Sequence, residues 1–156
     1  MLCCLLLTTL LAADHPGLEL IIVDISRDDC TAMIAEIGAW EEAYSKLPAN
    51  HKPNEPIALA KKVYNHGDTA IPFLMACLRQ AEFDRQSGLT DTKHLPRAAI
   101  LWVLSGSTIA RNIGISGEDT DEESTIWQVF WQNNYTHFLI NHKPIDQYWD
   151  PFAIKN

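Results

Sequence analysis

The sequence predicts an all-α fold, a compact bundle of five or six helices in a single domain. Apolar residues recur at helical spacing in several segments, and Ser, Asp, Asn or Thr precedes these segments as a candidate cap. The length of 156 residues suits one domain. The hydrophobic fraction of 47% and the charged fraction of 21% are ordinary for a globular chain, which needs neither a metal nor a disulfide to fold at this length.

The first segment, Leu2–Ala13, is an uncharged apolar run that is too short to cross a bilayer as a helix. Its length and its small closing residues are typical of a signal peptide, although no Lys or Arg precedes it. We therefore expect residues 1–13 to be removed and residues 14–156 to form a periplasmic or secreted domain. If the run is not cleaved, it is a buried helix of a cytoplasmic protein.

Residues 18–25 are rich in β-branched side chains, which favour a strand. No second segment has a convincing strand pattern, and a lone strand cannot satisfy its backbone hydrogen bonds. The segment is therefore expected to be helical or an extended lead-in.

From Ser26 the helical signal is clear. Ser26 can cap a helix whose first turn carries Asp28 and Asp29, where the helix dipole favours negative charge. This helix ends at Pro48, the first of three prolines in a nine-residue loop, and a short helix that ends at Gly67 is expected next. The predicted buried face of the first helix comprises Cys30, Met33, Ile34, Ile37, Tyr44 and Leu47.

Two further helices are expected before the acidic run. Asp68 precedes one with Pro72 in its first turn, and Thr92 precedes one with Pro96 in its first turn, where the missing N–H costs little. The second is expected to end near Gly114. The predicted apolar faces are Ile71, Leu74, Met75 and Leu78 in the first and Ala98, Ala99, Leu101 and Trp102 in the second.

Residues 67–112 resemble one HEAT-like helical hairpin. Gly67-Asp-Thr-Ala-Ile-Pro-Phe-Leu-Met-Ala-Cys-Leu78 is similar to the pattern of the repeat's first helix, and Pro96-Arg-Ala-Ala-Ile-Leu-Trp-Val-Leu104 to that of its second. The connection between them is longer than the repeat's turn, and no second copy occurs at a period of about 40 residues. The resemblance implies a helical scaffold with a binding surface and carries over no catalytic residue.

Two cysteines, Cys30 and Cys77, remain if residues 1–13 are removed. An even pair in an exported protein favours a disulfide, whereas free cysteine is among the most buried residue types. Both interpretations are open. Neither cysteine has a second Cys or His at ligand spacing, so we predict no metal site and no other cofactor.

The sequence contains no P-loop, no dinucleotide-binding glycine motif and no nucleophile elbow. No two of the six histidines are four residues apart, which a helical zinc site would need. We therefore predict no catalytic residue. An enzyme would have to bring His94, His137 or His142 against a carboxylate of another helix in a concave pocket.

The formal net charge of −8 argues against a general nucleic-acid binder and against docking on an anionic membrane surface. Residues 118–123 hold five acids in six positions. The simplest interpretation places these carboxylates at the positive end of the following helix. The other assigns them to a basic protein partner. The five acids are Glu118, Asp119, Asp121, Glu122 and Glu123.

Trp127 and Trp131 recur at helical spacing and form an aromatic stripe with Tyr135. The stripe lies either in the core or at an interface, where Trp and Tyr dominate binding energy. The function hypothesis takes the second alternative and adds Trp127 and Trp131 to the partner-binding acids.

The sequence as a whole favours a non-enzymatic protein-binding module. A concrete version is an inhibitor or immunity-type protein for an exported basic toxin or hydrolase, with charge steering the encounter. One alternative is a small helical hydrolase that uses His and carboxylate residues. Another is a structural accessory subunit of an envelope assembly, docked through the aromatic tail at residues 145–156.

Overall fold

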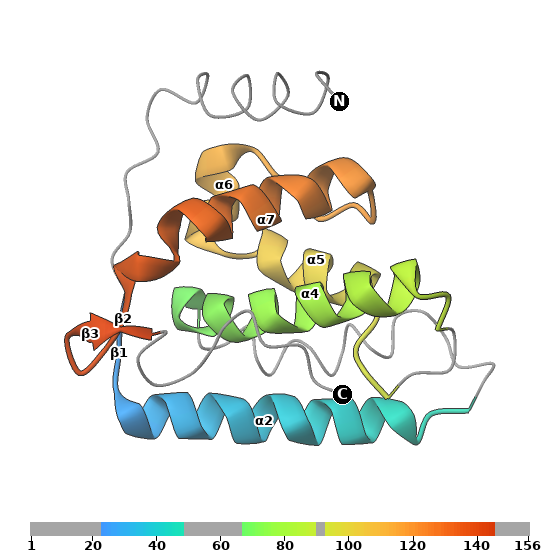
Figure 1. Ribbon diagram of the computed structural model, residues 1–156, viewed down its shortest axis with the longest axis horizontal. Helices are drawn as coiled ribbons and strands as arrows, with labels where there is room; N and C mark the ends of the chain where they lie inside the picture. The colour runs from blue at the N-terminus through green and yellow to red at the C-terminus, as the bar shows by residue number, and fades with distance from the viewer. Residues whose placement is uncertain (1–22, 49–66, 90–92, 146–156) are drawn as a thin grey trace.

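The computed structural model describes residues 23–48, 67–89 and 93–145, and within these ranges the chain is mostly helical, as the sequence predicts (Figure 1). The α-helices in these ranges are α2 (Arg27–Ser45), α4 (Ile71–Gln86), α5 (Arg97–Ser105), α6 (Thr108–Ile113) and α7 (Asp121–Asn134). The 3-10 turns are η1 (Gly67–Ala70) and η2 (Tyr135–His137). The strands are β1 (Val23–Ile25), β2 (Phe138–Ile140) and β3 (Lys143–Pro144).

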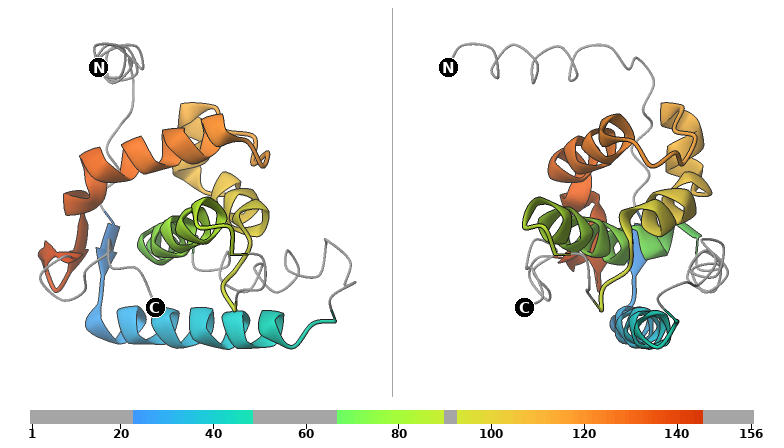
Figure 2. Two further views of the ribbon diagram at one scale, coloured as in Figure 1. Left: turned by 45° about the vertical axis from the view of Figure 1, so that its right-hand side comes forward. Right: turned by 90° about the vertical axis from the view of Figure 1, so that its right-hand side faces the viewer.

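Helix α4 lies in the middle of the bundle. It packs against α5 and α7 on one side and against α2 on the other, as Figures 1 and 2 show from several directions. Most of its side chains are therefore buried, and the buried set includes the polar residues Gln80, Glu82 and Asp84. Charged groups at such positions need partners, because burying an unpaired charge is costly.

Helix α2 begins where the sequence predicts. The Ser26 hydroxyl accepts a 3.0 Å hydrogen bond from the backbone N–H of Asp29, as an N-cap does. The buried face is formed by side chains three or four positions apart, which is the spacing of one helical face. Ile34 was expected on this face but is exposed. The buried residues are Cys30, Met33, Ile37 and Trp40.

The helix expected to end near Gly114 is divided into two. Helix α5 ends at Ser105, and the hydroxyl of Ser107 then caps α6 by accepting a 3.1 Å hydrogen bond from the N–H of Ala110. The predicted end at Gly114 is correct for α6, because Gly114 has the left-handed φ of 73° that ends many helices. The connection between α4 and α5 also contains residues 90–92, which lie outside the described ranges.

Residues 23–25, the described part of the segment before α2, form a strand, and the expectation that it has no partner is wrong. Strand β1 pairs in parallel with β2, so that Val23 lies opposite Phe138 and Ile25 opposite Ile140. Strand β2 pairs antiparallel with β3 through a two-residue turn in which Asn141 has a φ of 51°. A three-residue partner is too short to display the alternating pattern by which a strand is recognised in a sequence.

Cys30 and Cys77 are both buried thiols, and no disulfide joins them. Burial raises the pKa of the Cys30 thiol, because the charged thiolate is disfavoured away from water. The expected signal peptide, the short helix expected before Gly67, and residues 146–156 of the aromatic tail lie outside the described residues. Within the described ranges, no helix has the length and apolar character to cross a membrane.

Candidate functional site

The two tryptophans assigned to a partner lie in the core, so this prediction is wrong. Trp127 and Trp131 are 0% and 1% exposed. Trp127 meets Phe130 edge-on at 5.7 Å between ring centres, and Trp131 lies 5.1 Å from Phe138. Aromatic rings bury the most apolar area of any side chains, and α7 uses both indoles against the rest of the bundle.

The acidic run gathers at the N-terminus of α7, in agreement with the simplest interpretation of it. Asp121, Glu122 and Glu123 form the first turn of α7, where carboxylates interact favourably with the helix dipole. Thr120 is the cap, and its hydroxyl accepts a 3.1 Å hydrogen bond from the N–H of Glu123. The structure also gives three of the five acids specific partners.

Arg97, the first residue of α5, holds two of the predicted acids. Its Nε donates to Asp119 at 2.5 Å, and its Nη1 donates to Asp121 at 2.6 Å and to Glu82 at 3.1 Å. The Arg97 side chain is 12% exposed, whereas Asp119 and Asp121 are 48% and 74% exposed. Burial alone would lower the pKa of Arg97, but the hydrogen bonds to Asp121, Asp119 and Glu82 outweigh it and raise that pKa.

Glu82 is the buried centre of the same cluster. Its Oε1 accepts hydrogen bonds from the Ser124 hydroxyl at 2.6 Å and from Arg97, and its Oε2 accepts one from Nε of Arg85 at 3.1 Å. Burial would raise the pKa of Glu82, but these donors outweigh burial and lower it. Glu82 therefore links α4, α5 and α7 through one carboxylate.

Arg85 completes the arrangement by binding Glu82 and, through Nη2 at 3.1 Å, Asp121. The pKa of Asp121 is lowered, first by its hydrogen bond from Arg97 and then by the charge of Arg85. Networks of charge-assisted hydrogen bonds hold side chains more firmly than isolated surface pairs do. We call this set the arginine cluster: Glu82, Arg85, Arg97, Asp119 and Asp121.

Glu123 is used inside the fold. Its Oε1 accepts from the N–H of Ser116 at 2.9 Å, and its Oε2 accepts from the N–H of Gly117 at 2.8 Å. The carboxylate thus fixes the loop before α7 and is not part of an open acidic surface. Glu118 and Glu122, by contrast, are exposed, and each is a sequence neighbour of an acid of the arginine cluster.

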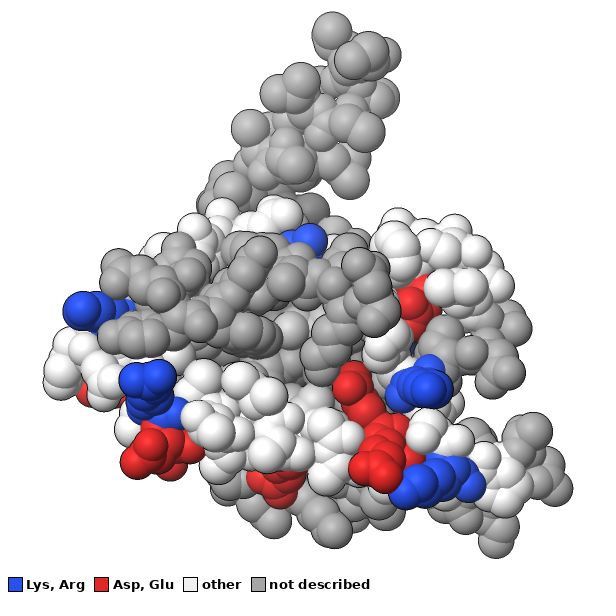
Figure 3. Space-filling view, turned by 60° about the horizontal axis from the view of Figure 1, so that its bottom comes forward, with Lys and Arg blue, Asp and Glu red and all other residues white. Residues whose placement is uncertain are grey.

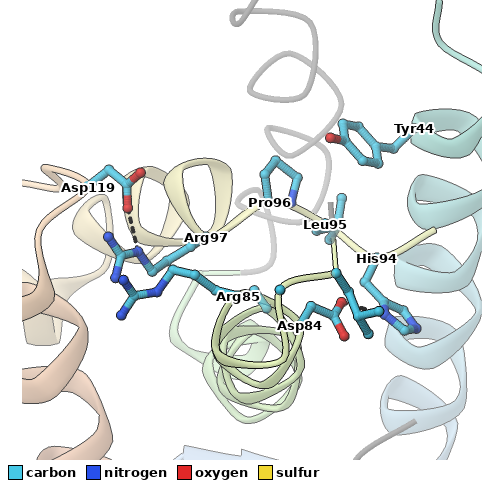
Figure 4. Close-up of a pocket in the computed structure, with 11 residues that line it drawn as sticks. Tyr44, Asp84, Arg85, His94, Leu95, Pro96, Arg97 and Asp119 are labelled. Carbon is cyan, nitrogen blue, oxygen red and sulfur yellow. Dashed lines mark hydrogen bonds and ion pairs between the residues drawn. The ribbon is translucent and has the colours of Figure 1, made fainter. Parts of the chain in front are cut away.

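A pocket of about 310 Å³ adjoins the arginine cluster. It lies between α2, the C-terminal end of α4 and the start of α5, and Figure 4 shows Asp119 and Arg97 on one side of it and Tyr44 and His94 on the other. Its volume is at the lower end of the range for ligand pockets. The lining residues are Tyr44, Ala81, Asp84, Arg85, Gly88, Leu89, His94, Leu95, Pro96, Arg97 and Asp119.

His94 is the one of the three histidines considered above that meets a carboxylate in this pocket. Its Nδ1 lies 2.9 Å from Oδ2 of the buried Asp84, whose Oδ1 accepts a 3.0 Å hydrogen bond from Nε2 of Gln80. His142 lies instead on the exposed turn between β2 and β3, where its Nδ1 is 3.4 Å from Oδ2 of Asp24 in β1. His137, in η2, does not line the pocket.

The pocket and the arginine cluster share a wall, because Arg85, Arg97 and Asp119 belong to both. The pocket wall and its bonded neighbours carry two guanidinium groups and four carboxylates, those of Glu82, Asp84, Asp119 and Asp121. The charges of Asp84, Asp119, Arg85 and Arg97 in the wall itself balance, and Glu82 and Asp121 behind the wall add the excess of negative charge. On the face of the molecule that Figure 3 shows, Lys or Arg side chains likewise lie close to Asp or Glu side chains.

Sequence reasoning missed Glu82, Asp84 and Arg97. No local signal singled out Glu82 or Asp84, because the second half of α4 also carries Arg79, Gln80, Arg85 and Gln86. Gln80 and Arg85 lie one helical turn from their partners, but His94, Arg97 and Ser124 are 10 to 42 positions away along the chain, too far for a local pattern to reveal. Among the residues that the structure describes, no group of three or more His, Cys, Asp or Glu is placed to hold a metal ion.

Comparisons of the chain with protein-family models, with curated proteins and with solved structures find no match.

Proposed function

We propose that the protein is a binding module that recognises a basic protein partner through the acidic rim of this pocket. One observation carries the proposal. Arg97 lines the pocket and holds two exposed carboxylates in place, that of Asp119 in the pocket wall and that of Asp121 beside it. Glu118 and Glu122, the sequence neighbours of Asp119 and Asp121, are also exposed acids.

Fixed carboxylates suit recognition for an energetic reason. Binding normally costs free energy to order flexible side chains at the interface. Arg97 and Arg85 already hold Asp119 and Asp121 in the unbound protein, so less ordering remains for the bound state. The net charge of −8 also steers a basic partner toward the molecule and speeds association at low salt.

A partner of this kind fits an inhibitor or immunity-type role, in which the protein covers part of an exported basic toxin or hydrolase. The proposal is supported by the small size of the chain, its acidic charge and the lack of a nucleophile motif in the sequence. It does not depend on Trp127 and Trp131, which are core residues.

The test is a selection of random displayed peptides on the immobilised protein. We expect enrichment of Lys and Arg and a rise in the Kd of the selected peptides as salt increases. Glu122→Lys should weaken binding, whereas Asp28→Lys is the matched control, because both acids are exposed in the first turn of a helix. Selected peptides without excess positive charge, or equal binding by both variants, would contradict the proposal.

A second candidate function, a small helical hydrolase, is favoured by the contact between His94 and Asp84. A buried carboxylate can hold a histidine ring in the orientation of a general base. Such an enzyme needs the second ring nitrogen of His94 to reach a water molecule or the substrate in the pocket. Hydrolysis of p-nitrophenyl acetate that is lost in Asp84→Asn and in His94→Gln would support it, and a rate equal to that of buffer in the intact protein would reject it.

A further inference from the structure

We propose that the pocket receives one cationic side chain, a lysine or arginine of the basic partner. This inference rests on the proposed function and names the group that the partner inserts. The charged end of the guest interacts with Asp119, and its aliphatic stem lies along the apolar part of the wall toward Asp84 and His94. The observations that carry it are the size of the pocket, its mixed lining and its excess of negative charge.

The size of the pocket favours a single long side chain. A volume of about 310 Å³ is small for a drug-sized ligand. The wall has an apolar part formed by Leu89, Leu95 and Pro96, against which a methylene chain can pack while its charged end stays near acceptors.

The electrostatic balance decides the sign of the guest. Two arginines line the pocket, and on that ground alone an anion would be the natural ligand. However, Arg97 is bound by three carboxylates and Arg85 by two, so their positive charge is already compensated. The excess negative charge of the site therefore repels an anion and attracts a cation.

Acceptor capacity remains for the guest. A carboxylate offers about four lone-pair sites. Asp84 accepts hydrogen bonds from Gln80 and His94, one on each oxygen, and Asp119 accepts from Arg97 on Oδ1. Both carboxylates line the pocket and can accept a further charge-assisted hydrogen bond.

The test uses matched single-residue probes and NMR titration of the intact protein. Nα-acetyl-arginine amide is compared with Nα-acetyl-citrulline amide, its neutral isostere, and Nα-acetyl-lysine amide with Nα-acetyl-norleucine amide. The ring signals of His94 and Tyr44 report on the pocket, and those of His142 are a control on the exposed turn. Saturable shifts with the cationic probes, and binding at least about fivefold weaker with the neutral ones, are expected.

Two variants with the same change in charge locate the binding site. Asp119→Asn and Asp121→Asn each keep an oxygen that can accept from Arg97, but only Asp119 lines the pocket. Asp119→Asn should weaken arginine binding about fivefold, and Asp121→Asn less than about twofold. Equal losses in the two variants, or neutral probes that bind as well as charged ones, would overturn the inference.

The outcomes also separate this inference from the proposed function. If the displayed peptides are basic and sensitive to Glu122→Lys while no cationic probe shifts His94 or Tyr44, the acidic rim binds the partner and the pocket inference is wrong. If the arginine probe binds and no basic peptide is enriched, the pocket takes a cation and the proposed protein partner is wrong.

Discussion

The hydroxyl of Ser124 in α7 donates a 2.6 Å hydrogen bond to Oε1 of Glu82 in α4, across 42 positions of sequence. Both residues are buried. The same carboxylate binds Arg97 of α5 and Arg85 of α4. The buried hydrogen bond and the ion pairs therefore form one unit that joins three helices at the wall of the pocket.

Glu82→Gln should destabilise the fold by about 1–3 kcal/mol, because the amide loses the ion pairs to Arg85 and Arg97 and places a buried NH2 group among donors that cannot accept its hydrogen bonds. The free energy of unfolding from urea denaturation measures this. Glu42→Gln is the matched control, since Glu42 pairs with Lys46 on the exposed side of α2. A loss no larger than that of the control would show that the Glu82 network adds little stability.

The pKa of Glu82 also predicts how stability depends on pH. Its pKa in the folded protein lies below its ordinary value of 4.5. The folded state therefore binds this proton less readily than the unfolded state, and the stabilisation is fully present above about pH 4.5 and is lost as pH falls through the lower folded value. Thermal unfolding between pH 7 and pH 3 should show a shallower loss of Tm in Glu82→Gln than in the native chain.

Helix α2 shows what the sequence could predict, because its determinants are local. The cap at Ser26 and the spacing of Cys30, Met33 and Ile37 are visible within a few turns of chain. The site depends on contacts of another kind. Arg97 meets Glu82 across 15 positions and Asp119 across 22, and no periodic pattern encodes such a contact.

The acidic run is an intermediate case. Its helix-capping role was predicted because carboxylates before an apolar helical segment have a local physical cause. The different partners of the individual acids were not predicted, because Asp119 binds Arg97 and Glu123 binds the loop at Gly117. Trp102 was expected on the buried face of its helix because it is apolar and lies at helical spacing, but it is 38% exposed. The packing of α5 in the folded protein determines which side of that helix stays exposed.

Gly117 lies so close to Ser105 that adding a single methyl group should lower the free energy of unfolding strongly. Its φ is +89°, and a Cβ added there would lie 2.5 Å from Oγ and 2.7 Å from Cβ of Ser105. Gly117→Ala should therefore cost more than Gly114→Ala, which has a similar φ but open space and should lose about 1–2 kcal/mol. Ser105→Gly should recover part of the loss in the double variant, and additive effects of the two changes would refute the steric explanation.

Trp127 should behave as a core residue and not as a binding residue. Trp127→Leu is expected to lower the free energy of unfolding by about 2–4 kcal/mol, because the smaller side chain leaves a cavity in a packed interior. Trp102→Leu should lose clearly less, since Trp102 is 38% exposed. The Kd of a selected basic peptide, measured on the folded fraction, should stay unchanged in Trp127→Leu, and a selective loss of binding would restore the interface interpretation.

Cys30 and Cys77 should react as buried thiols. In the native protein without reductant, iodoacetamide is expected to leave both cysteines unmodified, because burial restricts access and raises the pKa of Cys30. In urea, again without reductant, both should be alkylated fully, as peptide mass mapping can measure. A disulfide would give a different result, since the two peptides would then remain linked in urea until a reductant is added. The second step of the experiment therefore separates burial from oxidation, which the native reaction alone does not.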